Sequence, residues 1–379
     1  MSKNAQGISN TIRRHRLRKG WSQAALGQML GLGRQAVYDM ECGRYLPNTA
    51  VALAMAKLFA CSVESLFHTA VSDCGAAPRL VPHFAAHAER ALHPGSRLAL
   101  AYVRGELVGV PLEFFGTALL PAADAYVQSD GTVDVTSPPQ LIRQTLLLFG
   151  CNPALELLDS HMKRRLFSSR VRCIFASSGR ALDTLAGGNA HIAATHFHSG
   201  GGDDANAREA HKRLCGRAGR LVGFCANEEG LMVAPGNPLA IRTVADIAEK
   251  GVRFVNREQG AALRRLLDDH LARAGVPAEA VAGYDTQVYS HHEGACRVAF
   301  GAADAALGLG LVAASLGLDF IPLASTTCDL VIPDDVLADP AVDALMQALC
   351  SSRLRNELHG LPGFDASGTG SERPCAAGG

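Results

Sequence analysis

The sequence predicts a multidomain protein: an all-α bundle of short helices, a small β-rich connector, and a two-lobed α/β domain. The first 68 residues hold several short helical patterns, each flanked by residues that commonly begin or end a helix. Residues 139–364 alternate instead between apolar strand-like runs and helical patterns, which is typical of parallel α/β sheets. We expect domains at 1–70, 71–138 and 139–364, followed by a disordered tail at 365–379 that is small, polar and Gly-rich.

The composition is that of a globular protein. Of the 379 residues, 48% are hydrophobic and 19% are charged. The formal net charge is zero, so any contact with nucleic acid must come from a local basic patch. No apolar run reaches the roughly 18 residues needed to cross a bilayer, and the N-terminus lacks the apolar core of a signal peptide. We therefore expect a cytoplasmic protein without a membrane partner.

Helices are expected in the N-terminal part at Thr11–Lys19, after the N-cap Ser22, and at Arg34–Cys42, Thr49–Phe59 and Val63–Phe67. Gly20 ends the first helix, and Gly31-Leu32-Gly33 makes a tight turn between the second and the third. This order resembles the Cro/repressor-like (XRE) helix-turn-helix family. The residues that carry the resemblance are Arg16, Gly20, Ser22-Gln23, Leu26, Gly31, Arg34-Gln35, Val37, Glu41, Gly43, Pro47, Leu58 and Ser65-Leu66-Phe67. Two departures are Gly27, where the family usually has alanine, and Gly33, where it often has Ser or Thr.

The third helix is the expected reader of DNA, because the second helix of such a motif lies in the major groove. Arg bonds guanine and Gln bonds adenine through two hydrogen bonds each, at about 1–3 kcal/mol of discrimination. Gln23, at a helix N-terminus, suits a phosphate contact. The expected DNA-binding residues are Gln23, Arg34, Gln35, Tyr38, Asp39, Arg44 and Asn48. The basic residues between Arg13 and Arg44 outnumber the acidic ones and form the local positive patch. A basic bundle that binds protein is the alternative interpretation.

The connector is predicted from two apolar runs, Arg97–Val103 and Leu107–Leu112, that flank a glycine turn and indicate a β-hairpin. A helix is expected before the hairpin, at Phe84–Leu92. Further strands are expected near Ala125–Gln128 and Thr132–Val135. The sequence does not indicate what this connector does.

The C-terminal α/β patterns form two halves between which the chain crosses twice. Strands at Leu221–Cys225 and Leu231–Val233 are expected to lead out of the first half. Strands at Phe320–Leu323 and Asp329–Ile332 are expected to lead back. A final amphipathic helix is expected at Pro340–His359.

This arrangement resembles periplasmic-binding-protein-like (type II) domains of the molybdate-binding type, which are often fused to helix-turn-helix modules. The resemblance is carried by Gly150-Cys151-Asn152-Pro153, Ser177-Ser178-Gly179, Ala190–His196, Gly230-Leu231, Gly236-Asn237-Pro238, Val255–Asp268, Gly283-Tyr284, Ala302–Gly310 and Gly317–Pro322. Where relatives usually have Gly-Ser-Gly-Thr-Arg, this chain has Gly260-Ala261-Ala262-Leu263-Arg264, which removes hydroxyl groups.

An anion site is expected where helices of the two lobes begin. Ser177 and Ser178 end a strand, and Gly179 opens a helix whose free N–H groups attract negative charge. In the other lobe, Arg257 ends a strand ahead of a second helix start and suits a carboxylate or a phosphate. The expected ligand-binding residues are Ser177, Ser178, Gly179, Thr195, His196, Asn256, Arg257, Gln259, Gly260 and Tyr284. The alternatives are a structural salt bridge for Arg257 and simple helix capping for the two serines.

Metal binding and catalysis are not expected. The 11 cysteines include no CxxC pair, which argues against a zinc ribbon or a disulfide framework, and most should be small buried hydrophobes, with redox sensing left open. Histidines 191, 196 and 198 lie at a strand end, where a metal site is possible, but no matched Cys or acidic ligand is seen nearby. His291-His292 is expected to be a solvated helix start. No GxSxG, P-loop or HExxH motif occurs.

Together these features predict a ligand-responsive transcription regulator that binds operator DNA as a homodimer and senses a small anionic effector, with molybdate or tungstate as the leading candidate. No cofactor is expected. Three alternatives remain open. One is an enzyme or carrier in molybdenum-cofactor metabolism. Another is a regulator that senses a small organic carboxylate. The third is a DNA-binding adaptor that has lost its ligand.

Overall fold

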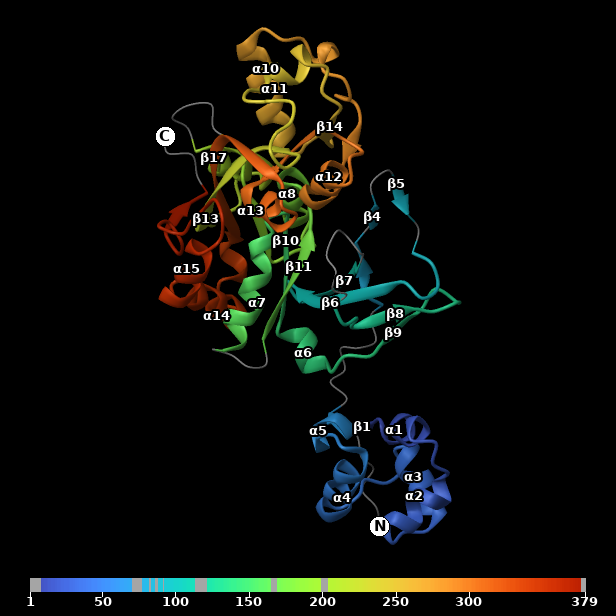
Figure 1. Ribbon diagram of the computed structural model, residues 1–379. Coiled ribbons are helices and arrows are strands. Elements are labelled where there is room, and N and C mark those ends of the chain that lie inside the picture. Colours follow the sequence, from blue (N-terminus) through green and yellow to red (C-terminus); the bar gives the residue numbers. More distant parts are fainter. Residues whose placement is uncertain are drawn as a thin grey trace. The chain divides into compact units, whose positions relative to one another are not determined.

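The computed structural model (Figure 1) describes residues 8–69, 77–81, 83–85, 88–90, 92–112, 121–164, 169–198 and 204–375. The chain divides into two compact units, Met1–Ala77 and Pro78–Gly379. Within the described residues, no helix is both long enough and apolar enough to cross a membrane.

The first unit is the predicted bundle of short helices. Its helices are α1 (Ile12–Arg18), α2 (Gln23–Leu30), α3 (Arg34–Glu41), α4 (Thr49–Phe59) and α5 (Val63–Leu66). Two short strands that the sequence did not indicate, β1 (Ile8–Asn10) and β2 (Phe67–Thr69), pair antiparallel and join the two ends of the bundle. The core contains Ile12, Leu26, Val37, Met40, Met55, Phe59 and Leu66.

The turn between α2 and α3 explains one departure from the family pattern. Gly31 ends α2 with a φ of 67°, in the left-handed region that glycine adopts without strain. A Cβ atom at Gly27 would lie 2.7 Å from the backbone oxygen of Leu32, which is too close for an ordinary contact. Glycine at position 27 therefore lets this turn pack tightly against α2.

A buried ion pair connects α1 to the end of α3. Nε of Arg16 donates to Glu41 at 2.6 Å, and the two side chains are only 9% and 3% exposed. Gln23 donates a further hydrogen bond of 2.8 Å to the same carboxylate. Burial by itself would raise the pKa of Glu41, but the hydrogen bonds from Arg16 and Gln23 outweigh it and lower that pKa. Arg16 is thus a structural residue and not part of an exposed basic patch.

The connector sheet has the strand order β3-β7-β6-β8-β9. These strands are β3 (Arg79–Leu80), β6 (Arg97–Val103), β7 (Glu106–Pro111), β8 (Ala125–Val127) and β9 (Val133–Val135), so the predicted hairpin is confirmed as β6–β7. The helix predicted at Phe84–Leu92 is wrong. Strands β4 (His83–Ala85) and β5 (Ala88–Arg90) pair antiparallel there, so strand pairing overrides the local helical pattern. Residues of the sheet share a core with the first α/β half, which places them in the same unit.

The α/β part is built on one ten-stranded sheet. Eight strands follow the order β11-β10-β12-β17-β13-β16-β14-β15, and the other two, β18 (Phe364–Asp365) and β19 (Glu372–Pro374), pair with β13. The first half contains β10 (Thr145–Gly150), β11 (Arg170–Phe175), β12 (Ile192–Thr195), α6 (Pro139–Arg143), α7 (Glu156–Lys163), α8 (Ser178–Ala186) and α9 (Ala205–Arg213). The second half contains β14 (Phe254–Arg257), β15 (Gln287–Val288), β16 (Ala305–Leu309), α10 (Ala245–Glu249), α11 (Ala262–Ala274), α12 (His291–Ala299) and α13 (Gly310–Ser315). The predicted alternation is confirmed in both halves, whereas α6, α9 and α13 were not predicted.

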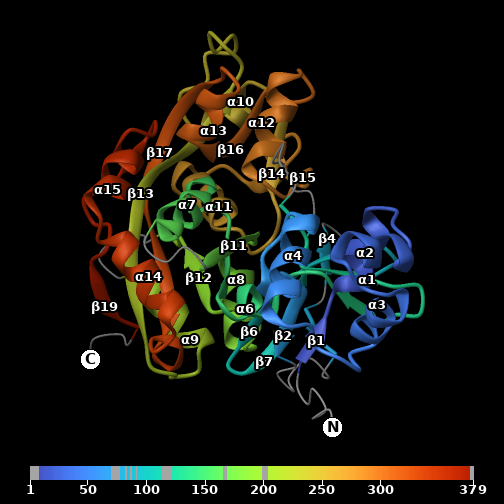
Figure 2. The same ribbon diagram turned by 90° about the horizontal axis from the view of Figure 1, so that it is seen from below.

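Two long strands carry the chain between the halves. β13 (Gly219–Val233) and β17 (Asp319–Pro333) are 15 residues each and pair antiparallel. Figure 2 shows the two strands running side by side. The sequence indicated each of them as two separate short strands. Their middle residues are polar, which interrupts the apolar pattern. The pairing continues through this region, with register shifts between Gly223 and Cys225 and between Glu229 and Gly230.

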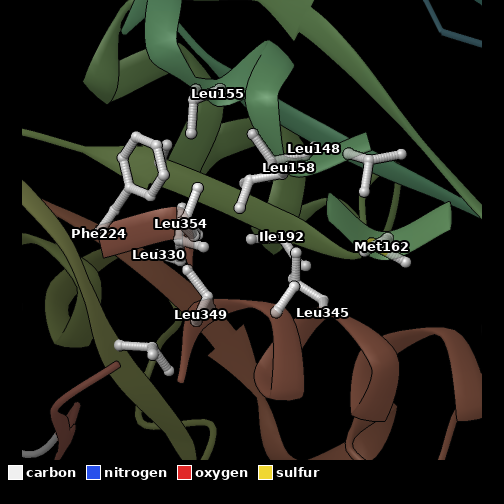
Figure 3. Packing of buried hydrophobic residues seen from close by; sticks show 14 of the residues in the cluster. Leu148, Leu155, Leu158, Met162, Ile192, Phe224, Leu330, Leu345, Leu349 and Leu354 are labelled. Carbon is white, nitrogen blue, oxygen red and sulfur yellow. The ribbon is translucent and has the colours of Figure 1, made fainter. Parts of the chain in front are cut away.

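The largest core cluster lies between the sheet of the first half and the last helices (Figure 3). Leu148 and Ile192 of the sheet pack there together with Leu158 of α7 and Leu345 of α14. The single helix predicted at Pro340–His359 is two helices, α14 (Pro340–Leu349) and α15 (Ser352–His359). Ser351 breaks the run because its side chain accepts a hydrogen bond from the backbone N–H of Leu354 and caps α15.

The prediction of a disordered tail at 365–379 is wrong for residues 365–375, and residues 376–379 lie outside the described part. Strands β18 (Phe364–Asp365) and β19 (Glu372–Pro374) both pair with β13. Arg373 forms two hydrogen bonds, of 2.9 and 2.6 Å, to the fully buried carboxylate of Asp329 and a further one to Asp204. The segment is ordered because a buried charge requires its cation.

We expect Arg373→Ala to lower the free energy of unfolding of the second unit by about 1–3 kcal/mol, because the Asp329 carboxylate would stay buried without its cation. Arg220→Ala, which removes an exposed pair with Glu372, is the matched control and should leave unfolding unchanged. Calorimetry of the full chain measures both. Equal stability of the two variants would contradict the role of Arg373.

The Arg16–Glu41 pair predicts acid sensitivity of the first unit. Because the pKa of Glu41 is lowered by folding, its contribution is complete above the unfolded value of about 4.3 and is lost as the pH falls through the lower folded value. Trp21 is the only tryptophan of the chain and stacks on Phe59 in this unit, so its fluorescence reports the unit selectively. Glu41→Gln should remove most of the loss of stability that the first unit shows as the pH falls through the folded pKa of Glu41. An unchanged acid transition in that variant would contradict this assignment.

Candidate ligand site and DNA-binding face

The helix starts of the two halves lie against each other. Ser178 begins α8 after β11, and the N-cap residue Ser177 makes no side-chain capping hydrogen bond. A Cβ atom at Gly179 would lie 3.6 Å from the backbone oxygen of Gly260, which precedes α11 in the other half. Glu209 of α9 and Arg265 of α11 add an ion pair of 4.0 Å across the same boundary. The structure therefore brings together the two segments that the sequence singled out.

A chain of buried polar contacts begins at Ser178. Its Oγ accepts a hydrogen bond of 3.1 Å from the backbone N–H of His196. Nε2 of His196 lies 2.8 Å from Sγ of Cys151, and Nδ1 lies 2.6 Å from Oε1 of Glu229. The hydroxyl of Thr326 donates to the other oxygen of Glu229 at 3.1 Å. The His196 ring is thus held on both sides, by a thiol and by a carboxylate.

The second half contributes Arg257 and His291 to the same place. Nε and Nη2 of Arg257 donate to the carboxylate of its neighbour Glu258 at 2.9 and 3.1 Å. Nη1 of Arg257 lies 3.4 Å from Nδ1 of His291, and the rings of His291 and His196 are 6.4 Å apart between centroids. We call the group formed by Cys151, Ser178, His196, Glu229, Arg257 and His291 the seam cluster. Each of its members is less than a tenth exposed.

The two imidazoles of the seam cluster have opposite electrostatic surroundings. Burial disfavours the charged form of both rings. At His196, the influence of Cys151 and Glu229 outweighs burial and raises the pKa well above its ordinary value. At His291, burial together with the positive charge of Arg257 lowers the pKa well below it. The same fold therefore shifts the pKa values of the two imidazoles in opposite directions.

Four other predicted ligand residues are not members of the seam cluster. Thr195 is fully buried, and its hydroxyl has no hydrogen-bond partner within the described ranges. Asn256 is buried and its side chain bonds the backbone of Arg257 and Tyr284. The hydroxyl of Tyr284 donates to Asp268 at 2.7 Å. Gln259 is exposed.

The sequence indicates that the second helix begins at Gln259-Gly260, and the structure corrects this start. Helix α11 begins at Ala262, two residues after Gly260, and it has no side-chain cap. The alternative for Arg257 was a salt bridge between the lobes or at a helix cap. In the structure Arg257 forms its salt bridge with the adjacent residue, Glu258. Ligand-binding roles for these residues remain proposals.

Sequence reasoning missed three members of the seam cluster. His291 was expected to be solvated, yet it is only 3% exposed. Cys151 supplies the thiol near His196 that was expected to be lacking, so the prediction that no Cys ligand is available there is wrong. Glu229 lies on β13. Only Cys151 gave a local signal, because it lies two residues after the apolar run 146–149, which predicts a strand and is part of β10.

The predicted DNA-binding residues cluster at α3 and its flanks. Arg34, Gln35 and Tyr38 are exposed on α3, and Gln35 donates to Asp39 one turn later at 3.1 Å. Arg44 lies over the ring of Tyr38, 5.3 Å from its centroid.

The other two DNA-binding candidates have structural partners. The side chain of Asn48 caps α4 by accepting a hydrogen bond of 2.9 Å from the backbone N–H of Val51. Gln23 is half-buried at the start of α2, where its amide is committed to Glu41. The exposed polar face of α3 is therefore the part free to meet the edges of bases, and the roles of Gln23 and Asn48 on DNA remain proposals.

Comparison with known proteins supports both parts. A helix-turn-helix family model matches residues 12–66, and the "PBP superfamily domain" model matches residues 159–350. The chain is 28% identical over 228 residues to the uncharacterized protein YvgK of Bacillus subtilis, covering 60% of this chain and 73% of that protein. It is 37% identical over 60 residues to the uncharacterized HTH-type transcriptional regulator YgzD of Bacillus subtilis, covering 16% of this chain and 91% of that protein.

Solved structures with a similar arrangement include Peb3 of Campylobacter jejuni, at 16% identity and a TM-score of 0.43, covering 58% of this chain and 99% of that one. The sulfate-binding protein SubI of Mycobacterium tuberculosis has 14% identity and a TM-score of 0.42, covering 56% and 84%. Similarity at this level carries no information on the ligand.

The PBP match spans just over half of the 379 residues, and the two halves joined by two crossing strands agree with it. The chain belongs to the PBP superfamily and carries an XRE-type helix-turn-helix domain at its N-terminus.

Proposed function

We propose that this protein is a transcription regulator whose affinity for operator DNA changes when a small ligand binds at the seam cluster. One observation carries the proposal: buried polar groups of both halves meet at a single place. Ser178 and His196 come from the first half, and Arg257 and His291 come from the second. A ligand that contacts both pairs binds the closed arrangement of the halves better than an open one, and only such a difference in affinity can shift a conformational equilibrium.

The chemistry of the cluster supports a small anion, with molybdate or tungstate as the leading candidate. Ser178 and the first N–H groups of α8 offer neutral donors at the positive end of a nine-residue helix. The charge of Arg257 is already balanced by Glu258. Two of its guanidinium nitrogens, Nε and Nη2, donate to Glu258, and only Nη1 lies outside that pair. A carboxylate ligand would need the paired nitrogens for a two-point contact. Neutral donors therefore favour an oxyanion over an organic carboxylate.

In the proposed regulator, α3 reads the operator and a homodimer presents two such helices to a palindromic site. Arg34 and Gln35 are exposed near the start of α3, where major-groove contacts are made. Asp39 and Arg44 hold the neighbouring side chains in place.

The ligand claim is tested by calorimetric titration of chelator-treated protein with molybdate, tungstate, sulfate and small carboxylates. We expect molybdate or tungstate to bind one site per chain. Ser178→Ala should weaken that binding by about 1–3 kcal/mol, because a donor in a buried site is lost. Ser367→Ala, which changes an exposed serine, is the matched control. Absence of heat with every one of these anions would overturn the anionic effector.

The base-reading role is tested on an operator selected from random-sequence DNA. Gln35→Ala should relax the preference at one base pair by about 1–3 kcal/mol while other positions keep theirs. Gln28→Ala, which changes an exposed glutamine of α2, is the control and should leave the preference unchanged. Uniform weakening by Gln35→Ala across all sequences would contradict a base contact.

A further inference from the structure

The seam cluster contains three side chains with the donor atoms of a transition-metal site. Cys151 follows β10, His196 follows β12, and His291 is the first residue of α12. One possible ligand atom from each lies within 4.8 Å of the others, and all three residues are buried. Two of the donors belong to the first half and the third belongs to the second half.

We propose that Cys151, His196 and His291 together bind one transition-metal ion of the zinc class, and that the ion links the two halves of the α/β domain. This site goes beyond the proposed anion sensor and does not rest on it.

The donor set selects the kind of ion. A thiolate and two imidazoles are ligands that zinc and copper(I) prefer, whereas magnesium and calcium require oxygen ligands. Zinc binds at roughly 2.3 Å to sulfur and 2.0 Å to nitrogen in tetrahedral sites. These bond lengths place tetrahedral sulfur and nitrogen ligands about 3.5 Å apart. Sγ of Cys151 and Nε2 of His196, now 2.8 Å apart, must therefore separate slightly to hold one ion between them. The donor atom of His291 already lies within 4.8 Å of both. The fourth position is left for water or another small ligand.

A second observation points to a missing ligand at His291. Its Nε2 atom is buried and has no hydrogen-bond partner in the described part of the chain, although the residue is only 3% exposed. A buried donor or acceptor without a partner costs about 1–3 kcal/mol, so native proteins rarely leave one. A metal ion at this nitrogen supplies the partner that the protein itself does not.

The surroundings of His196 are those of a metal-bound histidine. Its Nδ1 donates to Glu229, and Glu229 is fixed in turn by Thr326. A carboxylate behind a histidine orients the ring and strengthens it as a ligand, as in many zinc sites. Glu229 has no exposed surface, so this contact is well protected from water.

The charges of the occupied site balance. A zinc ion carries two positive charges, and Cys151 as a thiolate and Glu229 as a carboxylate carry one negative charge each. Arg257 and Glu258 already compensate one another. The site therefore buries no net charge, which is the condition for holding ions in a protein interior. When His291 binds through Nε2, its ring proton lies on Nδ1, and Nη1 of Arg257 must withdraw from its present 3.4 Å.

A thiol, an imidazole and a carboxylate in line also resemble the arrangement around a nucleophilic cysteine. Two features favour the metal. Cys151 is only 6% exposed, so a substrate has little access to its sulfur. His291 adds a third donor, which a nucleophilic cysteine does not use. A reactive Cys151 is the alternative that the alkylation experiment below detects.

The experiment is a zinc chloride titration of the reduced, chelator-treated full-length protein, with a competing chromophoric chelator. We expect one zinc ion per chain. Cys151→Ser and His291→Gln, one from each half, should each weaken binding at least about 100-fold, and Glu229→Gln about 10–100-fold. The matched controls, Cys350→Ser and His292→Gln, change neighbouring or exposed residues of the same types and should bind zinc like the natural protein.

Cobalt(II) gives a second readout, because a cobalt–thiolate bond produces a charge-transfer band in the near ultraviolet. The band should appear in the natural protein and in Cys350→Ser and be lost in Cys151→Ser. No zinc uptake, or a band that persists in Cys151→Ser, overturns the site. Rapid alkylation of Cys151 by iodoacetamide without protection by zinc also overturns it and indicates a nucleophile.

The two proposals fail separately. Molybdate binding without zinc binding would remove the metal site alone. Zinc binding without any anion binding would keep the metal site and remove the anionic effector.

Discussion

The antiparallel pairing of β13 with β17 is the constraint on which the rest of the α/β domain depends. These two strands run through both halves and are shared by both sheet regions. Their polar middle residues include Glu229 and Thr326, which hold the His196 ring from behind. The same strands therefore join the halves and position the seam cluster between them. A movement of one half against the other must bend this pair and change the cluster together with it.

Most of the buried charges discussed above are paired with an opposite charge in direct contact. Arg257 is balanced by Glu258, Asp329 by Arg373, and Glu41 of the first unit by Arg16. Glu229 differs, because its partner among the described residues is a histidine and not an arginine or lysine. The seam cluster is thus the place where an added ion or small ligand changes the charge balance most.

Local signals allowed much of the fold to be predicted from sequence. Ser22 and Gly31 define the ends of α2 through capping and a left-handed turn, and both depend on residues close in the chain. The long strands were predicted only in fragments, because the residues near Asn227 face a polar interior and break the apolar pattern. Strand β19 was missed because its order comes from a distant partner, Asp329. Likewise Ser178 was predicted from a local strand–helix junction, whereas His291 joins the cluster only through folding.

The central claim is that binding of a small ligand at the seam cluster changes the affinity of the protein for operator DNA. The most direct measurement is the affinity of the full-length protein for its selected operator, with and without saturating molybdate or tungstate, at one salt concentration. The account predicts a change of at least about fivefold, in either direction, which is the usual lower range of coupling between two sites. Equal operator affinity of the free protein and of protein shown to be fully ligand-bound would contradict it.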